Sequence, residues 1–257
     1  MSTRIWHWIN AITLVLMLMS GLMIFNAHPR LYWGEFGANP DHAWLEIGSQ
    51  GREGYLRVAD IRMKTTGFLG LWEDDRGRPN SRAFPHWATI PSYYSLALSR
   101  RWHLTFAWLF AIGVSAYGFW SLLNGHFRRD LLPGLSELKP AHLWRDIKRH
   151  VTLDFPKGAA AISYNTLQKL SYLGVFLMLA VLVLTGLTMS PAMDAVWPWL
   201  LDLFGGRQSA RSIHFIAAVS MVLFLVVHLL MVLLAGPINE IRSMITGWFK
   251  LPEEDIQ

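Results

Sequence analysis

Four histidines lie in or at the mouths of long apolar stretches of this sequence: His7, His103, His214 and His228. An ionisable side chain inside a membrane is unfavourable, so each of these histidines marks a candidate functional site. His214 and His228 are 14 residues apart in the last stretch. On an α-helix this spacing leaves them only ~40° apart in direction and ~21 Å apart in height. One helix face would therefore present two imidazoles at two depths.

The apolar stretches themselves are long enough to cross a membrane. Four runs of about 20 residues contain no Asp, Glu, Lys or Arg: Ile5–Phe25, Leu104–Leu123, Leu170–Met189 and Phe215–Ala235. The composition is 53% hydrophobic and 16% charged, which is typical of membrane proteins. We therefore predict an all-α membrane protein, a four-transmembrane-helix bundle that forms a single membrane domain. The helices are expected at about residues 5–25, 100–124, 166–190 and 211–236.

Alternating helix directions sort the four histidines into two layers. His103 and His214 both begin helices at one face of the membrane, whereas His7 and His228 fall in the opposite half. Paired histidines in two layers suit two bis-His haems of b type, enclosed by the bundle and stacked across the membrane. A lone intramembrane histidine can instead hydrogen-bond a neighbouring helix or serve in a proton relay. The absence of cysteine excludes disulfides, Cys-ligated iron–sulfur clusters and c-type haem attachment.

Three of the four histidines follow an arginine by three residues. The motifs are RIWH, RRWH and RSIH, in which the arginines are Arg4, Arg100 and Arg211. Positions i and i+3 share a helix face, so each arginine would lie one turn from its histidine. A guanidinium there can pair with a haem propionate at the membrane surface. The alternative is that these arginines are ordinary basic anchors beside the membrane.

The distribution of charge predicts the orientation in the membrane. The connection 125–165 is rich in Lys and Arg, whereas the segment between the third and fourth helices contains a single basic residue, Arg207. The positive-inside rule then places this connection and both termini in the cytoplasm of a bacterial inner membrane protein. The net charge of +5 is attributed to lipid-facing flanks and not to nucleic-acid binding.

Residues 26–99 are consequently expected to form a periplasmic loop or cap. This segment is rich in Trp, Tyr, Gly and Pro. It suits either a folded cap with an interfacial aromatic belt or a docking surface for a partner. The remaining histidines lie in loops and are interpreted as solvated: His28, His42, His86, His126, His142 and His150.

The motifs resemble the di-haem, four-helix cytochrome b family. This family includes the membrane b-type subunits of nickel–iron hydrogenase, formate dehydrogenase (the gamma subunit) and thiosulfate reductase. The resemblance rests on RIWHWINA opening the first helix, a histidine opening the second, and RSIHF…VVHLL in the fourth. It implies that His7 and His228 ligate the inner haem, and that His103 and His214 ligate the outer haem.

The resemblance also implies a quinone site and a class of partner. Formate dehydrogenase members carry Tyr-Asn-x-Gly-Gln-Lys at the start of the third helix, where quinone binds beside the inner haem. Here YNTLQK supplies Tyr164, Asn165, Gln168 and Lys169, with Leu167 at the glycine position. Asn165 and Gln168 are thus implied quinone ligands, although they equally suit capping of the helix start. The stretches FNAHPRLYWGEFG, LTGLTMSPAMD and LFGGRQSARSIHF are similar to a subgroup that accompanies periplasmic molybdopterin oxidoreductases.

The function expected from these observations is transmembrane electron transfer. Two b haems would carry electrons between the quinone pool and a periplasmic redox partner such as a molybdopterin oxidoreductase. An alternative is a stand-alone, quinone-linked haem oxidoreductase that acts on a small molecule such as superoxide. The long segment 26–99 favours a docked partner, because a minimal haem bundle does not need it. A transporter would need broken helices or membrane-embedded acids, and the four apolar runs contain no acid.

Overall fold

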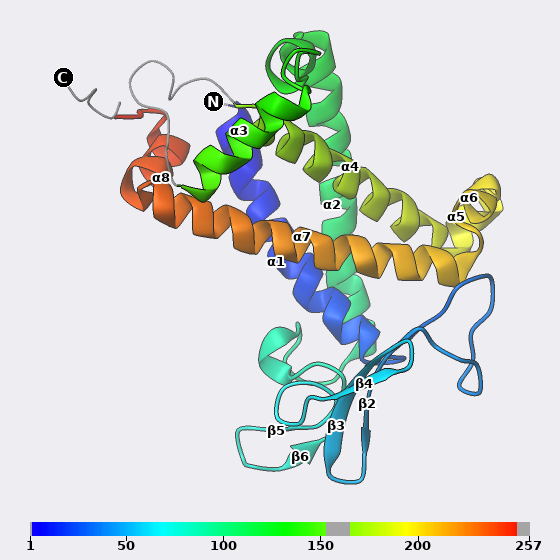
Figure 1. The fold of residues 1–257 in the computed structure, drawn as a ribbon. Helices are drawn as coiled ribbons and strands as arrows, with labels where there is room; N and C mark the ends of the chain where they lie inside the picture. The colour runs from blue at the N-terminus through cyan, green and yellow to red at the C-terminus, as the bar shows by residue number, and fades with distance from the viewer. Residues whose placement is uncertain (1, 153–164, 251–257) are drawn as a thin grey trace. The chain divides into compact units, whose positions relative to one another are not determined.

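The computed structural model describes residues 2–152 and 165–250. The longest helices are α1 (Ser2–Phe25), α2 (Leu96–Leu123), α4 (Thr166–Thr188) and α7 (Arg207–Ala235) (Figure 1). All four are long and apolar enough to cross a membrane. Large apolar side chains point outward from them; Leu223 and Leu233 on α7 are each 64% exposed. Because such surfaces are stable in lipid and not in water, the predicted four-transmembrane-helix protein is confirmed.

The chain divides into two compact units. Unit 1 contains Met1–Trp8, Gly113–Ala180 and Val219–Gln257, and unit 2 contains Ile9–Ile112 and Val181–Ala218. Each of the four long helices contributes one segment to each unit.

Unit 2 contains an antiparallel sheet that the sequence did not predict. Its strands are ordered β1-β2-β3-β4 and comprise Arg30–Leu31, Leu45–Gln50, Glu53–Val58 and Ile61–Lys64. The β2–β3 register pairs Gln50 with Glu53, and Gly51 adopts a φ of 60° in the two-residue turn between them. A position with left-handed backbone conformation in a tight hairpin turn favours glycine, because glycine has no Cβ atom. A second hairpin joins β5 (Trp72–Glu73) to β6 (Pro79–Asn80).

The sheet packs against residues of the long helices within unit 2. Phe25, at the end of α1, is buried with Leu31, Leu45, Ile47 and Ala83, and Phe215 of α7 packs against this cluster. Unit 2 also holds the short helices η1 (His86–Ala88), α5 (Pro191–Val196) and α6 (Trp199–Phe204). The predicted cap at 26–99 is therefore folded, and its core includes helix residues.

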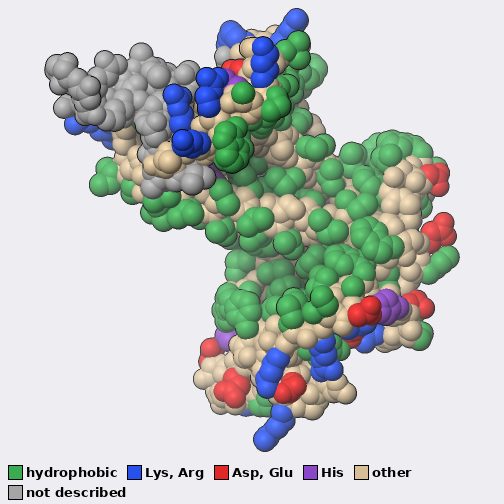
Figure 2. Space-filling model, in the orientation of Figure 1, with side chains coloured by type: hydrophobic (Ala, Val, Ile, Leu, Met, Phe, Trp, Pro, Cys, Tyr) green, Lys and Arg blue, Asp and Glu red, His purple; other side chains and the backbone are tan. Residues whose placement is uncertain are grey.

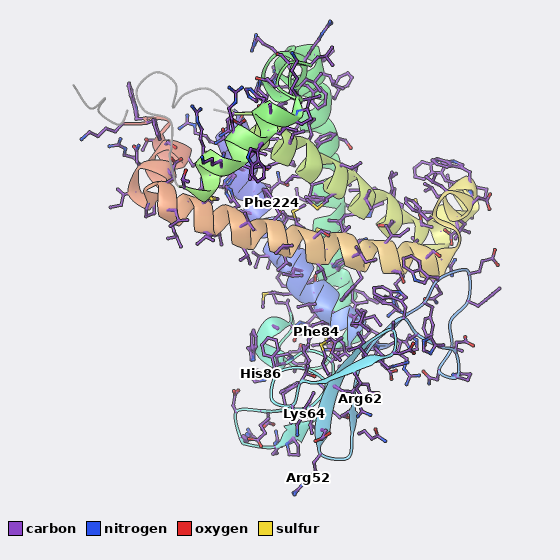
Figure 3. All side chains as sticks on the ribbon, in the orientation of Figure 1. Arg52, Arg62, Lys64, Phe84, His86 and Phe224 are labelled. Atoms are coloured by element: carbon purple, nitrogen blue, oxygen red, sulfur yellow. The ribbon has the colours of Figure 1, made fainter. Side chains whose placement is uncertain are left out.

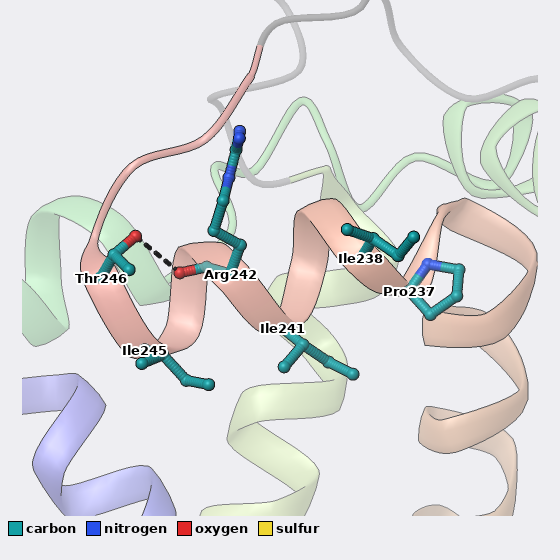
Figure 4. Close-up of a pocket in the computed structure, with 6 residues that line it drawn as sticks. All are labelled: Pro237, Ile238, Ile241, Arg242, Ile245 and Thr246. Atoms are coloured by element: carbon teal, nitrogen blue, oxygen red, sulfur yellow. Dashed lines mark hydrogen bonds between the residues drawn. The ribbon is translucent and has the colours of Figure 1, made fainter.

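Unit 1 contains short helices that flank its long-helix segments. They are the π-helix η2 (Phe127–Leu131), α3 (Pro140–Val151) and α8 (Pro237–Thr246). A shallow hollow of about 450 Å³ on α8 is lined by Pro237, Ile238, Ile241, Arg242, Ile245 and Thr246 (Figure 4). One apolar and one polar face on a short helix suit the membrane–water interface.

Charged and apolar side chains separate between these elements. Hydrophobic side chains cover the long helices, whereas charged side chains gather over the sheet and over the short helices (Figure 2). All four residues of β4 are exposed, including Arg62 and Lys64 (Figure 3). This segregation is what a protein partly surrounded by lipid requires.

A buried carboxylate holds the sheet together. Glu46 on β2 is only 6% exposed. Its oxygens accept hydrogen bonds from Arg30 Nη2 at 2.6 Å, Arg57 Nη2 at 2.5 Å and the Tyr55 hydroxyl at 2.9 Å. Burial raises the pKa of Glu46, but the hydrogen bonds from Arg57, Tyr55 and Arg30 outweigh it and bring the pKa below its usual value.

We expect Glu46→Gln to destabilise the sheet by about 2 kcal/mol, because two guanidinium groups lose their carboxylate. The pKa of Glu46 is lower in the folded than in the unfolded protein. Its contribution is therefore complete above its unfolded pKa of 4.5 and is lost as the pH falls below that value. The protection factors of amides in residues 45–58, which correct for the intrinsic pH dependence of hydrogen exchange, should thus fall in acid in the native protein, and much less in the variant. The exposed pair Glu53–Lys64 supplies the control Glu53→Gln, which should change exchange little. Equal effects of the two substitutions would contradict the assignment.

Candidate functional site

His103 of α2 and His214 of α7 lie opposite each other in unit 2. Their ring centroids are 6.3 Å apart, and the ring planes make an angle of 64°. The structure brings together the two residues that helix direction alone had paired.

The ring of His103 is fixed through its Nδ1 atom by α1. Nδ1 lies 3.0 Å from the carbonyl oxygen of Met17 and 3.2 Å from Ser20 Oγ. A carbonyl oxygen only accepts hydrogen bonds, so Nδ1 of His103 carries the proton. The ring nitrogen Nε2 is left with its lone pair, which is the form that binds a metal ion.

The ring of His214 is fixed in the same way by α4. Thr185 Oγ1 lies 3.0 Å from His214 Nδ1 and donates its own proton to the carbonyl of Val181 at 2.6 Å. Because the hydroxyl hydrogen of Thr185 already points to this carbonyl, Oγ1 accepts a hydrogen bond from Nδ1–H of His214, so Nε2 of His214 is also unprotonated. Sequence reasoning missed Ser20 and Thr185, both of which are fully buried at 0% exposure.

A glycine follows each of these hydroxyl residues. A Cβ atom at Gly21 would lie 3.3 Å from Cε1 of His103, and one at Gly186 would lie 3.7 Å from Cε1 of His214. The sequences Ser20-Gly21 and Thr185-Gly186 thus combine a hydrogen-bond acceptor with room for the ring. A small residue is needed most at Gly21, where the contact would be tighter than usual.

His7 and His228 form the corresponding pair in unit 1. Their ring centroids are also 6.3 Å apart, at 59°. The ring of His228 stacks on Phe224, with centroids 5.8 Å apart and planes at 11°; Phe224 is labelled in Figure 3. Nδ1 of His7 is buried without a hydrogen-bond partner. In the same unit, Gly113 makes room for the indole of Trp6, which would come within 2.2 Å of a Cβ atom at this glycine.

The 6.3 Å separation of the rings in each pair matches that of two imidazoles that bind one metal ion between them. A metal ion bound by two imidazole nitrogens at about 2 Å each puts the ring centres roughly 6 Å apart. Within residues 2–152 and 165–250, no group of three or more His, Cys, Asp or Glu side chains could hold a metal ion. Two protein ligands per site therefore suit the axial positions of a haem, whose porphyrin supplies the remaining ligands.

The three arginines of the repeated motif have different surroundings. Arg4 Nη1 donates to the carbonyl of Ile245 at 3.1 Å, near the end of α8. Arg100 is exposed. Arg211 is partly buried, donates to the backbone carbonyl of His28, and lies 5.6 Å above the ring of Phe25. Only Arg211 thus presents a guanidinium in a sheltered position within unit 2.

Asn165 and Gln168 cap the start of α4. The Gln168 amide N–H donates to Asn165 Oδ1 at 2.9 Å, and the Asn165 amide N–H donates to Gln168 Oε1 at 3.0 Å. This reciprocal pair is a capping box, in which both side-chain oxygens are already used. Asn165 Nδ2 lies 3.5 Å from His150 Nε2 and keeps a second N–H, and the NH₂ group of Gln168 is a further potential donor. Tyr164 of the same motif lies outside the described residues.

Two loop histidines are less solvated than the sequence analysis predicted. His28 Nε2 and His86 Nδ1 are both buried without a hydrogen-bond partner. His86 Nε2 lies 3.1 Å from Asp75, and its ring contacts Trp72 (Figure 3). The prediction of a solvated side chain is wrong for both residues, whereas it holds for the exposed His42.

Comparison with known proteins places the chain in a family. The sequence profile of prokaryotic cytochrome b561 matches residues 1–247. A relative from Azospira oryzae, provisionally named as the protein-methionine-sulfoxide reductase subunit YedZ1, is 30% identical over 57% of this chain and 70% of its own. A relative from Azotobacter vinelandii, provisionally named as a Ni/Fe-hydrogenase B-type cytochrome subunit, is 25% identical over 60% of this chain and 70% of its own. No solved structure gives a significant match.

The match covers all four membrane helices and both histidine pairs. With the apolar helices and the paired imidazoles, it establishes b-type haem as the cofactor and electron transfer as the activity. The chain belongs to the prokaryotic cytochrome b561 family of membrane electron-transfer proteins.

Proposed function

We propose that this protein carries electrons through two b-type haems, one bound by His103 and His214 and the other by His7 and His228. The observation that supports this most is the equal 6.3 Å separation of the rings in two independent pairs. When bound, the haem iron supplies the redox chemistry. The protein supplies axial ligands, excludes water with apolar side chains, and sets the potential through the groups that contact the ligands.

The ligand histidines should each govern one haem. We expect His214→Ala to remove the haem of unit 2 and His228→Ala to remove the haem of unit 1. Each variant should keep about half of the b-type absorbance, because axial ligation is independent at the two sites. The exposed His42→Ala is the control and should keep all of it. Loss of all haem from a variant with native helix content would contradict the two-site arrangement.

The hydrogen bond from His214 to Thr185 should tune the potential of its haem. A ligand histidine that donates through Nδ1 is a stronger electron donor and stabilises oxidised iron. Thr185→Val should therefore raise the midpoint potential of one haem by about 59 mV, which corresponds to a change of about tenfold in the equilibrium constant for its reduction. Thr185→Ser should restore the native value in the same redox titration.

Thr188 provides a matched control on the same helix. It is equally buried, and its hydroxyl donates to the carbonyl of Leu184 without contacting a histidine. If Thr188→Val shifts the potential as much as Thr185→Val, the effect arises from packing in α4 and not from the ligand.

The electrons are proposed to enter or leave through quinone beside His7 and His228, at the start of α4. The side-chain NH₂ groups of Asn165 and Gln168 support this, because each could donate an N–H to a quinone carbonyl oxygen, although Asn165 Nδ2 also lies 3.5 Å from His150 Nε2. Their capping role limits the proposal, since it explains these residue types without a ligand.

Capping and quinone binding can be separated at Asn165. Asn165→Asp keeps an oxygen that caps the helix but removes the NH₂ donor, whereas Asn165→Leu removes both. If quinone binds here, both variants should slow haem reduction by quinol about tenfold with unchanged absorption spectra, because a hydrogen bond worth ~1.4 kcal/mol is lost. Native quinol kinetics in Asn165→Asp would leave Asn165 with capping alone. The next candidate would then be a pocket of about 230 Å³ in unit 1, lined by Thr3, Tyr117, Trp120, Ser121, Asn124, His126 and Arg129.

The protein is proposed to lie in a bacterial inner membrane with both termini and the 125–165 connection in the cytoplasm. The Lys and Arg residues of that connection support this orientation. The folded cap of unit 2 would then be periplasmic.

A periplasmic oxidoreductase is the proposed redox partner. The cap exposes large aromatic side chains, including Trp33, Phe36, Trp87 and Tyr93, which are residue types that anchor protein interfaces. The relatives are provisionally named as subunits of a methionine-sulfoxide reductase and of a Ni/Fe-hydrogenase, so both names imply an enzyme partner. A molybdopterin enzyme is the partner class that the sequence resemblance implies. The cap favours such a partner over a small molecule such as superoxide.

A further inference from the structure

Arg211 carries a charge that no described carboxylate neutralises. Among residues 2–152 and 165–250, its guanidinium makes one hydrogen bond, to the backbone carbonyl of His28, and no ion pair. One side of the group is covered by the ring of Phe25. A guanidinium has five N–H donors, and a sheltered one is unfavourable unless an anion or several acceptors contact it.

His28 presents a second unsatisfied group at the same place. Its Nε2 atom is buried without a partner. The ring is held against Tyr32, with centroids 5.7 Å apart and planes at 23°. Its backbone is also fixed, because His28 N donates to the carbonyl of Phe25 and the carbonyl of His28 accepts from Arg30 N. The imidazole is therefore held in a defined position with one nitrogen available.

We propose that Arg211 and His28 together bind one carboxylate, a propionate of the haem held by His103 and His214. This inference rests on the proposed haem site of unit 2. Arg211 lies three residues before His214 in α7, so it is on the same face of the helix, one turn toward the helix start. A propionate would accept hydrogen bonds from the guanidinium and from Nε2–H of His28, and would satisfy both groups at once.

The charges around His28 fit a neutral donor in this role. Burial lowers the pKa of His28, and the neighbouring guanidinium groups of Arg211 and Arg30 lower it further. His28 is thus uncharged near neutral pH and has one N–H to donate. In this arrangement Arg211 provides the positive charge, and the fixed ring of His28 provides a hydrogen-bond donor in a defined position.

The test is a redox titration of the two haems in the full-length protein. His28→Phe keeps a ring against Tyr32 but removes the nitrogen. This variant should lower the midpoint potential of the haem that His214→Ala removes. The equilibrium constant for reduction of that haem should fall about fivefold, which is the effect of one hydrogen bond. Losing a donor leaves more negative charge on the propionate, and that charge disfavours the reduced state. His28→Gln keeps an N–H donor and should retain most of the native midpoint.

Two further variants separate this role from others. Arg211→Gln should lower the same midpoint, and its effect should be non-additive with His28→Phe because both groups contact one carboxylate. His42→Phe, on the exposed surface of the cap, should change neither midpoint.

The proposal is overturned if both midpoints stay native in His28→Phe, or if the two haems shift equally. It is also overturned if added inorganic phosphate shifts the native midpoint as the substitution does, because a solution anion then occupies the site. If the His214→Ala variant keeps all the haem of the native protein, the underlying haem assignment is refuted instead. The two failures are therefore distinguishable.

Discussion

A buried imidazole nitrogen is unfavourable unless it has a partner, and Nδ1 of His7 in unit 1 has none among the described residues. In unit 2 this constraint is met at Nδ1 by the protein itself, through Met17 and Ser20 for His103 and through Thr185 for His214. Ser20 and Thr185 hydrogen-bond carbonyls of their own helices, so they are satisfied whether or not a histidine is present. On each ring the nitrogen Nε2 then keeps its lone pair, which is the form of imidazole that binds a metal ion.

The cap of unit 2 extends the same site. The start of α7 is tied to the cap by hydrogen bonds from Trp44 Nε1 to Ser212 Oγ and from Ser212 Oγ to the carbonyl of Tyr32. Ser209 Oγ accepts from the amide of Gly34 in the same region. These contacts fix the turn of α7 that precedes His214 and hold Arg211 in place. The cap therefore helps to position the turn of α7 that carries Arg211 and His214.

The sequence predicted those features that lipid dictates. A helix is required wherever some 20 apolar residues cross a bilayer, and the 14-residue spacing of His214 and His228 then fixes their common face. The sheet was not predicted because its strands are short and its stability depends on Glu46, whose partners Arg30 and Arg57 become apparent only after folding. His28 was misassigned because its environment depends on distant residues such as Arg211, which donates to its backbone carbonyl from 183 residues away. The capping of α4 was predictable in part, since Asn165 and Gln168 have the spacing of a capping box. The contacts of Ser20 and Thr185 could also have been suspected, because in each case a hydroxyl residue is followed by glycine inside an apolar span.

The central claim is that each of two histidine pairs in one chain binds its own haem. Electron paramagnetic resonance of the oxidised, purified protein, combined with haem quantification, tests this most directly. Two bis-histidine sites predict two distinct low-spin ferric signals and two b-type haems per chain. A single haem per chain, or a stoichiometric high-spin signal from iron that lacks a second histidine ligand, would contradict the claim.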